Sequence, residues 1–94
     1  MPMLYLICYD IASPKRRKKL ADVLLDHGDR VQKSAYECDL KTDAGLRALL
    51  ARARKHLDPH QDTLRVYRVC ASCRAEAQAL GLDHARPVEK TIIL

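Results

Sequence analysis

The hydrophobic pattern in the first third of the chain predicts a buried strand followed by a helix. Residues 3–11, MLYLICYDI, are an almost unbroken apolar run, which is typical of a central strand with both faces covered. Ser13 and Pro14 then supply an N-cap and the first helical position, where proline is favoured. Because apolar residues recur at helical spacing up to Gly28, the sequence predicts a first helix over about residues 14–27.

The middle of the chain continues this alternation of strand and helix. Residues 30–40, RVQKSAYECDL, predict a second strand. Thr42 or Asp43 is expected to cap a second helix, which ends before Pro59. Residues 63–70, TLRVYRVC, predict a third strand.

The C-terminal part completes the predicted fold. Residues 76–82 fit either a helix or a short strand, and residues 87–94, PVEKTIIL, predict a last strand. Two strand–helix units followed by strands predict an α/β (α+β) sandwich over residues 1–94, a single domain in which one sheet is covered by two helices. No helix remains for the other face of the sheet. We therefore expect a homodimer through that face, in which the C-terminal strand crosses to the second subunit.

The composition excludes several protein classes. Of the 94 residues, 48% are hydrophobic and 31% are charged, which excludes a disordered or collagen-like chain. No apolar run approaches the ~20 residues that a membrane span needs. The N-terminus also lacks the basic stretch and the cleavage site of a secretory signal. We expect a cytoplasmic protein without a membrane partner.

The net charge of the chain is positive. Seventeen Lys and Arg against twelve Asp and Glu give +5 at pH 7. This surplus suits a polyanion such as RNA or duplex DNA, and it equally suits a slightly basic domain with no such partner. With four tyrosines and no Phe or Trp, the chain has few rings on which bases can stack. If nucleic acid binds, we expect contacts to its backbone.

Four cysteines occur in the chain, at positions 8, 38, 70 and 73. In a cytosolic protein such thiols are usually buried or idle and are not a disulfide framework. Cys70 and Cys73 have metal-ligand spacing, and His56 and His60 lie upstream, so a Cys2His2 zinc site is conceivable. Pro59 argues against it, because proline interrupts the helix that would place both imidazoles on one face.

Asp10 is the first candidate functional residue. It ends the apolar run and precedes a helix N-terminus, a place where a carboxylate costs free energy unless it is paired or bound to a cation. The structural alternative is that it caps the turn at Ala12 and Ser13. One carboxylate makes a poor magnesium site, but a two-fold axis would add the Asp10 of a second subunit. Ser13 would then offer a hydroxyl or a water contact.

A run of five cations, KRRKK from Lys15 to Lys19, lies in the first turns of the predicted first helix. Positive charge at this end opposes the helix dipole, which an anion such as a phosphate would relieve. The alternative is a solvated basic face, since five successive helical residues point all round the axis.

The second predicted strand has a polar face. Arg30 and Gln32 share parity with Ser34 and Tyr36, so one side of this strand is expected to line a groove. An edge strand protected from aggregation by charge explains the same pattern.

These segments together resemble a known family. The run MLYLICYDI, the pair Arg16-Arg17, the leucine-rich helix and the segment GDRVQKSAYE resemble the small CRISPR-associated protein of spacer acquisition, family two. The later DTLRVYRVC matches as well, so the resemblance covers nearly the whole chain. It implies a ferredoxin-like fold, a homodimer, and a role in inserting foreign DNA fragments into the CRISPR array beside the larger integrase subunit.

The resemblance also implies an endonuclease that cuts RNA or duplex DNA with Mg²⁺ or Mn²⁺. By position, Asp10 would be the catalytic metal ligand, shared across the dimer, with Tyr9 beside it. A regular ferredoxin-like repeat has two strands between its helices, whereas the pattern predicts one long strand over residues 30–40.

The nucleic-acid contacts implied by the resemblance are mostly basic. Arg17, Lys19 and Arg30 would hold phosphates, with Arg16 in the same basic run, and Tyr36 occupies an aromatic position of the family. The chain departs mildly from the family, with Tyr at 36 where Phe is usual and Lys19 where Arg occurs. Lysine in place of arginine matters if the contact is bidentate.

Three functions follow from these residues. The first is the metal-dependent endonuclease, in which a pair of Asp10 carboxylates holds one Mg²⁺. The second is a non-catalytic scaffold dimer that clamps DNA and bridges the integrase subunits, which needs only charge, symmetry and an edge strand. The third, a small ligand sensor, lacks any apolar pocket pattern and ranks last.

Overall fold

The structure, a computed structural model, describes residues 3–81 and 92–93. The elements of this part follow in the order β1 (Met3–Asp10), α1 (Pro14–Leu25), β2 (Gly28–Gln32), β3 (Ala35–Leu40), α2 (Asp43–Arg54), β4 (Thr63–Val69), α3 (Ala71–Ala75), β5 (Gln78–Ala79) and β6 (Ile92–Ile93). Helices α1 and α2 have 12 residues each. No helix in the described residues is both long enough and apolar enough to span a bilayer.

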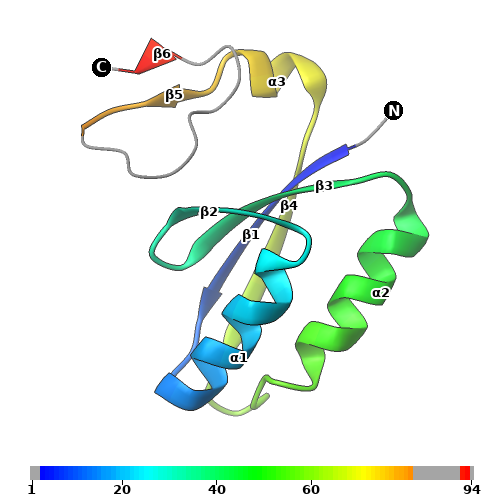
Figure 1. Ribbon diagram of the computed structural model, residues 1–94, viewed down its shortest axis with the longest axis vertical. Helices are drawn as coiled ribbons and strands as arrows, with labels where there is room; N and C mark the ends of the chain where they lie inside the picture. Colours follow the sequence, from blue (N-terminus) through cyan, green and yellow to red (C-terminus); the bar gives the residue numbers. More distant parts are fainter. Residues whose placement is uncertain (1–2, 82–91, 94) are drawn as a thin grey trace.

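The central feature is a four-stranded sheet with the strand order β2-β3-β1-β4, in which all neighbours are antiparallel. Helices α1 and α2 lie side by side on one face of this sheet (Figure 1). The order β1-α1-β2-β3-α2-β4, with β1 between β3 and β4, is the ferredoxin-like arrangement. The predicted fold class is therefore confirmed.

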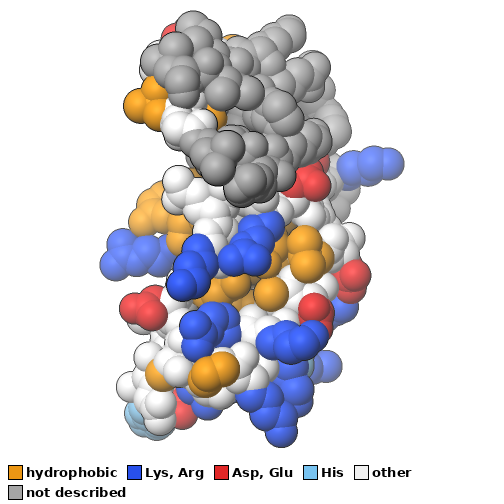
Figure 2. Space-filling model, turned by 60° about the vertical axis from the view of Figure 1, so that its left-hand side comes forward, with side chains coloured by type: hydrophobic (Ala, Val, Ile, Leu, Met, Phe, Trp, Pro, Cys, Tyr) orange, Lys and Arg blue, Asp and Glu red, His pale blue; other side chains and the backbone are white. Residues whose placement is uncertain are grey.

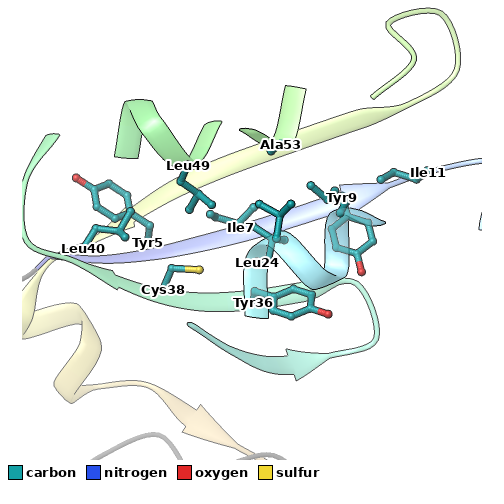
Figure 3. Close-up of a cluster of buried hydrophobic side chains, with 12 residues drawn as sticks. Tyr5, Ile7, Tyr9, Ile11, Leu24, Tyr36, Cys38, Leu40, Leu49 and Ala53 are labelled. Atoms are coloured by element: carbon teal, nitrogen blue, oxygen red, sulfur yellow. The ribbon is translucent and has the colours of Figure 1, made fainter. Parts of the chain in front are cut away.

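The core lies between the sheet and these two helices. β1 contributes Tyr5, Ile7 and Tyr9, which alternate along the strand as period-two side chains must. Leu24 of α1 and Leu49 of α2 pack onto them from the helix layer and are fully buried (Figure 3). Each such side chain contributes about 1.5–3 kcal/mol to folding by leaving water.

Local sequence signals set the ends of the helices. The Ser13 hydroxyl oxygen accepts a backbone N–H of the first turn of α1 at 3.3 Å, and that of Thr42 does the same for α2 at 3.0 Å. α1 ends at Leu25, earlier than predicted, because β2 already begins at Gly28. A side chain at Gly28 would collide with the Glu37 carbonyl oxygen of β3, so this close approach requires glycine.

The single strand expected over residues 30–40 is wrong. The chain forms two strands there, β2 ending at Gln32 and β3 beginning at Ala35, as a ferredoxin-like repeat requires. The turn between them consists of Lys33 and Ser34, and it contains neither glycine nor proline to mark it in the sequence.

The polar face expected on this segment is also wrong. The register shifts between Arg30 and Gln32, so that Arg30 lies opposite Tyr36 while Gln32 lies opposite Ala35. Because Tyr36 and Ala35 are successive residues of β3, they face opposite sides of the sheet. The β-bulge thus places Arg30 on the helix side and Gln32 on the other side.

The C-terminal part differs from the prediction at one junction. β4 ends at Val69, and Cys70 caps the short helix α3 and does not extend the strand. The ambiguous residues 76–82 include the two-residue strand β5, which pairs in parallel with β6. Of the strand predicted over residues 87–94, only β6 lies within the described residues. The exchange of this strand between subunits stays a prediction.

Candidate nucleic-acid and metal site

Asp10 ends β1 on the face of the sheet that α1 and α2 leave uncovered. Its neighbour Tyr9 points into the core, so the Asp10 side chain points to the opposite side, and it is exposed. In the register of β1 and β4 it lies opposite Thr63. Within the described residues the Asp10 carboxylate takes part in no hydrogen bond or ion pair. The capping contact to Ala12 and Ser13, the structural alternative for this residue, is therefore not formed.

Asp62, next to Thr63, has the opposite environment, and no sequence pattern had singled it out. Its side chain is 0% exposed and accepts four hydrogen bonds. Two come from the backbone N–H groups of Ala12 at 3.0 Å and Asp58 at 2.9 Å. The other two come from the Arg16 guanidinium, by Nε at 2.8 Å and Nη2 at 3.1 Å. We call Asp62, Arg16, Ala12 and Asp58 the Asp62 clamp.

The Asp62 clamp fixes the segment that follows Asp10. It joins the loop before β4 to the loop after β1 and the first turn of α1, which lie about 50 residues earlier in the sequence. The Arg16 guanidinium, together with these N–H groups, holds the pKa of the Asp62 carboxyl well below its usual range. Because Asp62 binds Ala12 and Arg16 on one side and Asp58 on the other, the chain just after Asp10 is held against the loop before β4.

Arg16, a predicted nucleic-acid contact, therefore already has a partner inside the protein. Its side chain remains 30% exposed. No sequence pattern indicated this pair, because the two residues are 46 positions apart and meet only when β1 and β4 pair antiparallel.

Tyr9 and Tyr36 both belong to the core. Their exposed fractions are 8% and 1%, and their rings stack with centroids 6.1 Å apart (Figure 3). Burial and the neighbouring Tyr9 hydroxyl raise the pKa of Tyr36 to about 12. Neither ring lies on the surface, so their contribution in this structure is to packing.

The other predicted phosphate contacts are more accessible. Lys19 and Arg30 are exposed, and Arg30 donates from Nε to the Gln32 carbonyl oxygen at 3.3 Å. Arg17 is half-buried, and its Nε is buried without a hydrogen-bond partner in the described part of the protein. Such an orphaned donor is costly unless a ligand satisfies it. Figure 2 shows Lys and Arg side chains gathered around hydrophobic side chains on one face of the molecule.

The uncovered face of the sheet is mixed in character. Leu6 and Cys8 of β1 are half-buried there, and Tyr67 of β4, opposite Leu6, is 47% exposed. Arg65, opposite Cys8, donates to the Tyr67 hydroxyl at 3.3 Å. We call these four residues the open-face patch. An apolar strip with a charged neighbour is typical of a surface that binds another protein.

The described residues contain no cluster of three or more His, Cys, Asp or Glu that fits a metal ion. Cys70 and Cys73 follow β4, whereas His56 and His60 precede it, so the length of the strand separates the two pairs. The conceivable Cys2His2 zinc site is therefore not formed. Asp10 alone supplies too few oxygens for a hard divalent cation within one chain.

Comparisons with known proteins agree with this architecture. The family profile of the CRISPR associated protein Cas2 matches residues 3–77. A CRISPR-associated endoribonuclease Cas2 of Chloroflexus aurantiacus is 47% identical over 81 residues, which cover 84% of this chain and 85% of that protein.

Two solved structures are similar in fold and sequence. A hypothetical protein from Thermus thermophilus superposes with a TM-score of 0.79 at 41% identity, covering 88% of this chain and 95% of the other. A chain of a partial Cas6-RT-Cas1–Cas2 complex superposes with a TM-score of 0.70 at 28% identity, covering 80% and 81%.

Proposed function

Because the chain belongs to the CRISPR-associated Cas2 family, we propose that it acts in spacer acquisition as a metal-dependent endonuclease, with Asp10 as its central catalytic residue. The observation that carries this proposal is the contrast at the end of β1. Asp10 is exposed and its carboxylate forms no hydrogen bond or ion pair with the described residues, while the segment just after it is fixed by the Asp62 clamp. A carboxylate that is held in place but unpaired suits a ligand from outside the chain.

The active form is a homodimer. The open-face patch, with Leu6, Cys8 and the exposed Tyr67, lies on the same side of the sheet as Asp10. Pairing this face with its copy would bury the patch and bring the two Asp10 carboxylates to a common two-fold axis. The dimer thereby doubles the number of oxygen ligands that one chain offers.

Two Asp10 carboxylates would hold one Mg²⁺ or Mn²⁺, since both cations prefer carboxylate oxygens. Such a cation, when bound, lowers the pKa of water and offsets negative charge on a phosphate. In this arrangement Tyr9 supports β1 from the core, and the Asp62 clamp keeps the end of the strand from moving.

The substrate is RNA or duplex DNA, bound through its phosphates. Arg17 offers a buried Nε that has no hydrogen-bond partner among the described residues, and the exposed Lys19 and Arg30 supply further positive charge. Arg16 stays a predicted contact through the exposed part of its side chain. The protein partner is a larger integrase subunit of the Cas1 type, which is supported by the similarity to a chain of the Cas1–Cas2 complex.

The test is cleavage of labelled RNA and labelled duplex DNA by the wild type and Asp10→Asn, with Mg²⁺, with Mn²⁺ and with EDTA. The matched control is Asp43→Asn, which removes an exposed carboxylate at the start of α2. This control residue lies far from Asp10. It follows the end of β3, which pairs with Met3 at the opposite end of β1 from Asp10. All three proteins are first shown to be folded dimers.

We expect metal-dependent cutting by the wild type and by Asp43→Asn, and a loss of at least about a hundredfold for Asp10→Asn. The substrate that is cut identifies RNA or DNA as the preferred class. Cutting that persists in Asp10→Asn or in EDTA would contradict the proposal and indicate a contaminating nuclease.

A scaffold without catalysis is the second candidate, and the basic surface in Figure 2 favours it. In that case the dimer clamps duplex DNA and bridges the integrase subunits. Its test is binding of uncut duplex DNA as a function of salt, with Lys15→Gln/Lys19→Gln beside the wild type. Loss of two phosphate contacts should reduce the slope of log K against log salt by about two. Assembly with the integrase subunit that survives Asp10→Asn, together with no cutting by the wild type, would favour the scaffold.

A further inference from the structure

The pair Cys70 and Cys73 is not used by the proposed function. We propose that these two thiols form a redox-active dithiol site, which closes to an intramolecular disulfide by exchange with a small disulfide such as oxidised glutathione. The site lies where the chain leaves β4 and enters α3, and it is independent of Asp10 and of the nucleic-acid contacts.

The two cysteines are exposed and adjacent. The Cys70 Sγ accepts the backbone N–H of Cys73 at 3.4 Å, and it lies 3.2 Å from the Ser72 hydroxyl oxygen. Helical geometry places Cα atoms three residues apart at about 5 Å. This separation is within the span of roughly 4.4–6.8 Å that disulfides bridge. Closure therefore needs side-chain rotation and little backbone movement.

The chemistry of the two thiols is unequal. The hydrogen bond with the Ser72 hydroxyl and the Cys73 N–H lower the pKa of Cys70 to about 7, while the neighbouring Cys70 raises the pKa of Cys73. Near neutral pH, Cys70 is therefore the thiolate that attacks, and Cys73 is the thiol that resolves. By contrast, burial raises the pKa of Cys38 in the core to about 11.

The exchange proceeds in two steps. The Cys70 thiolate attacks one sulfur of the small disulfide, forming a mixed disulfide and releasing one small thiolate. Cys73 then gives up its proton and attacks the Cys70 sulfur, which closes the protein disulfide and releases the second thiolate. The two protein thiols lose two electrons in total, and the small disulfide gains them.

The position of the site connects it to the sheet. Arg74, the residue after Cys73, forms a bidentate ion pair with Asp39 of β3 at 2.8 and 3.3 Å. Closure of the disulfide fixes the first turn of α3 beside this contact. The closed loop is short, so chain entropy predicts only a small gain in thermal stability. The informative readout is chemical.

The test uses the full chain with EDTA present, incubated with a range of ratios of oxidised to reduced glutathione. The cysteines that remain reduced are then alkylated with iodoacetamide, and the alkylated fraction at each position is quantified by mass spectrometry. We expect Cys70 and Cys73 to become protected together in the wild type, without a glutathione adduct and without a covalent dimer. Alkylation is carried out after the chain is unfolded in urea, so that Cys8, which is half-buried here and covered in the proposed dimer, reacts fully and serves as the internal control.

Two variants separate the roles. Cys73→Ser should accumulate a stable glutathione adduct at position 70, and Cys70→Ser should form its adduct several times more slowly. Equal rates for the two variants would overturn the assigned roles. Three results for the wild type would overturn the intramolecular site. They are alkylation of both thiols at every glutathione ratio, glutathione adducts at both positions, and a disulfide between two chains.

Discussion

Asp10 and Asp62 lie one position apart where β1 and β4 pair, yet their environments are opposite. Asp62 accepts four hydrogen bonds and its side chain is fully buried, whereas Asp10 is exposed and has no bond from its carboxylate within the described residues. An aspartate side chain thus stabilises the fold at position 62 and is available to a ligand at position 10. A buried carboxylate must satisfy its bonding internally, so a carboxylate without internal bonds marks the place to look for function.

The largest effect is expected when the Asp62 clamp is broken. Asp62→Ala leaves the half-buried Arg16 guanidinium and two backbone N–H groups without their acceptor, and such unpaired groups are costly. We expect the melting temperature to fall by roughly 10 °C, as measured by circular dichroism. A fall of only a degree or two would show that the clamp does not stabilise this end of the sheet.

A smaller loss of stability is expected when the charge of Arg16 is kept but its two-pronged guanidinium contact is removed. Arg16→Lys retains a cation but cannot donate through both Nε and Nη2 to the Asp62 carboxylate. We expect about half of the fall seen for Asp62→Ala. In the double variant the two losses should not add, because both remove the same interaction. Additive losses would indicate that Arg16 stabilises the fold through other contacts.

The stability of the protein should depend on pH through Asp62. Because the pKa of Asp62 is lowered from the ordinary 3.8, this group stabilises the folded state above about pH 4. That contribution is lost as the pH falls from about 4 through the folded-state pKa. The free energy of unfolding, measured with urea between pH 7 and pH 2, should therefore fall more steeply for the wild type than for Asp62→Asn. Parallel curves would contradict the assignment.

The smallest effect on stability is expected at Arg17, where the consequence should appear in binding. In the part of the chain that the structure describes its Nε has no hydrogen-bond partner, so Arg17→Gln should change the free energy of unfolding by about 1 kcal/mol or less. The affinity for duplex DNA or RNA should fall, and the salt slope should decrease by about one. A large loss of stability with unchanged binding would assign Arg17 to the fold.

Sequence patterns predicted the fold well where each signal was local. The apolar run before Asp10, the Ser13 cap and the Thr42 cap all correspond to observed elements. The β2–β3 turn was missed, because Lys33-Ser34 carries no typical turn residue pair and the bulge beside Arg30 disturbs the alternation.

The candidate site was predictable only in part, for a physical reason. Asp10 could be singled out because a carboxylate is unusual at the end of an apolar strand. The role of Asp62 depends on a partner 46 positions away, which no local pattern reveals. Tyr36 was placed among the contacts by resemblance alone, and its burial to 1% exposure follows from the packing of β3 beneath α1.

The most direct test of Asp10 as a metal ligand is thermal unfolding of the wild type, Asp10→Asn and Asp62→Asn side by side at pH 7, with and without Mn²⁺. We expect Asp10→Asn to unfold at the temperature of the metal-free wild type and Asp62→Asn to unfold at a clearly lower temperature. We also expect Mn²⁺ to raise the melting temperature of the wild type and not that of Asp10→Asn, since a ligand stabilises only the state that binds it. If Asp10→Asn unfolded at as low a temperature as Asp62→Asn, Asp10 would be a residue of the fold and not an available metal ligand.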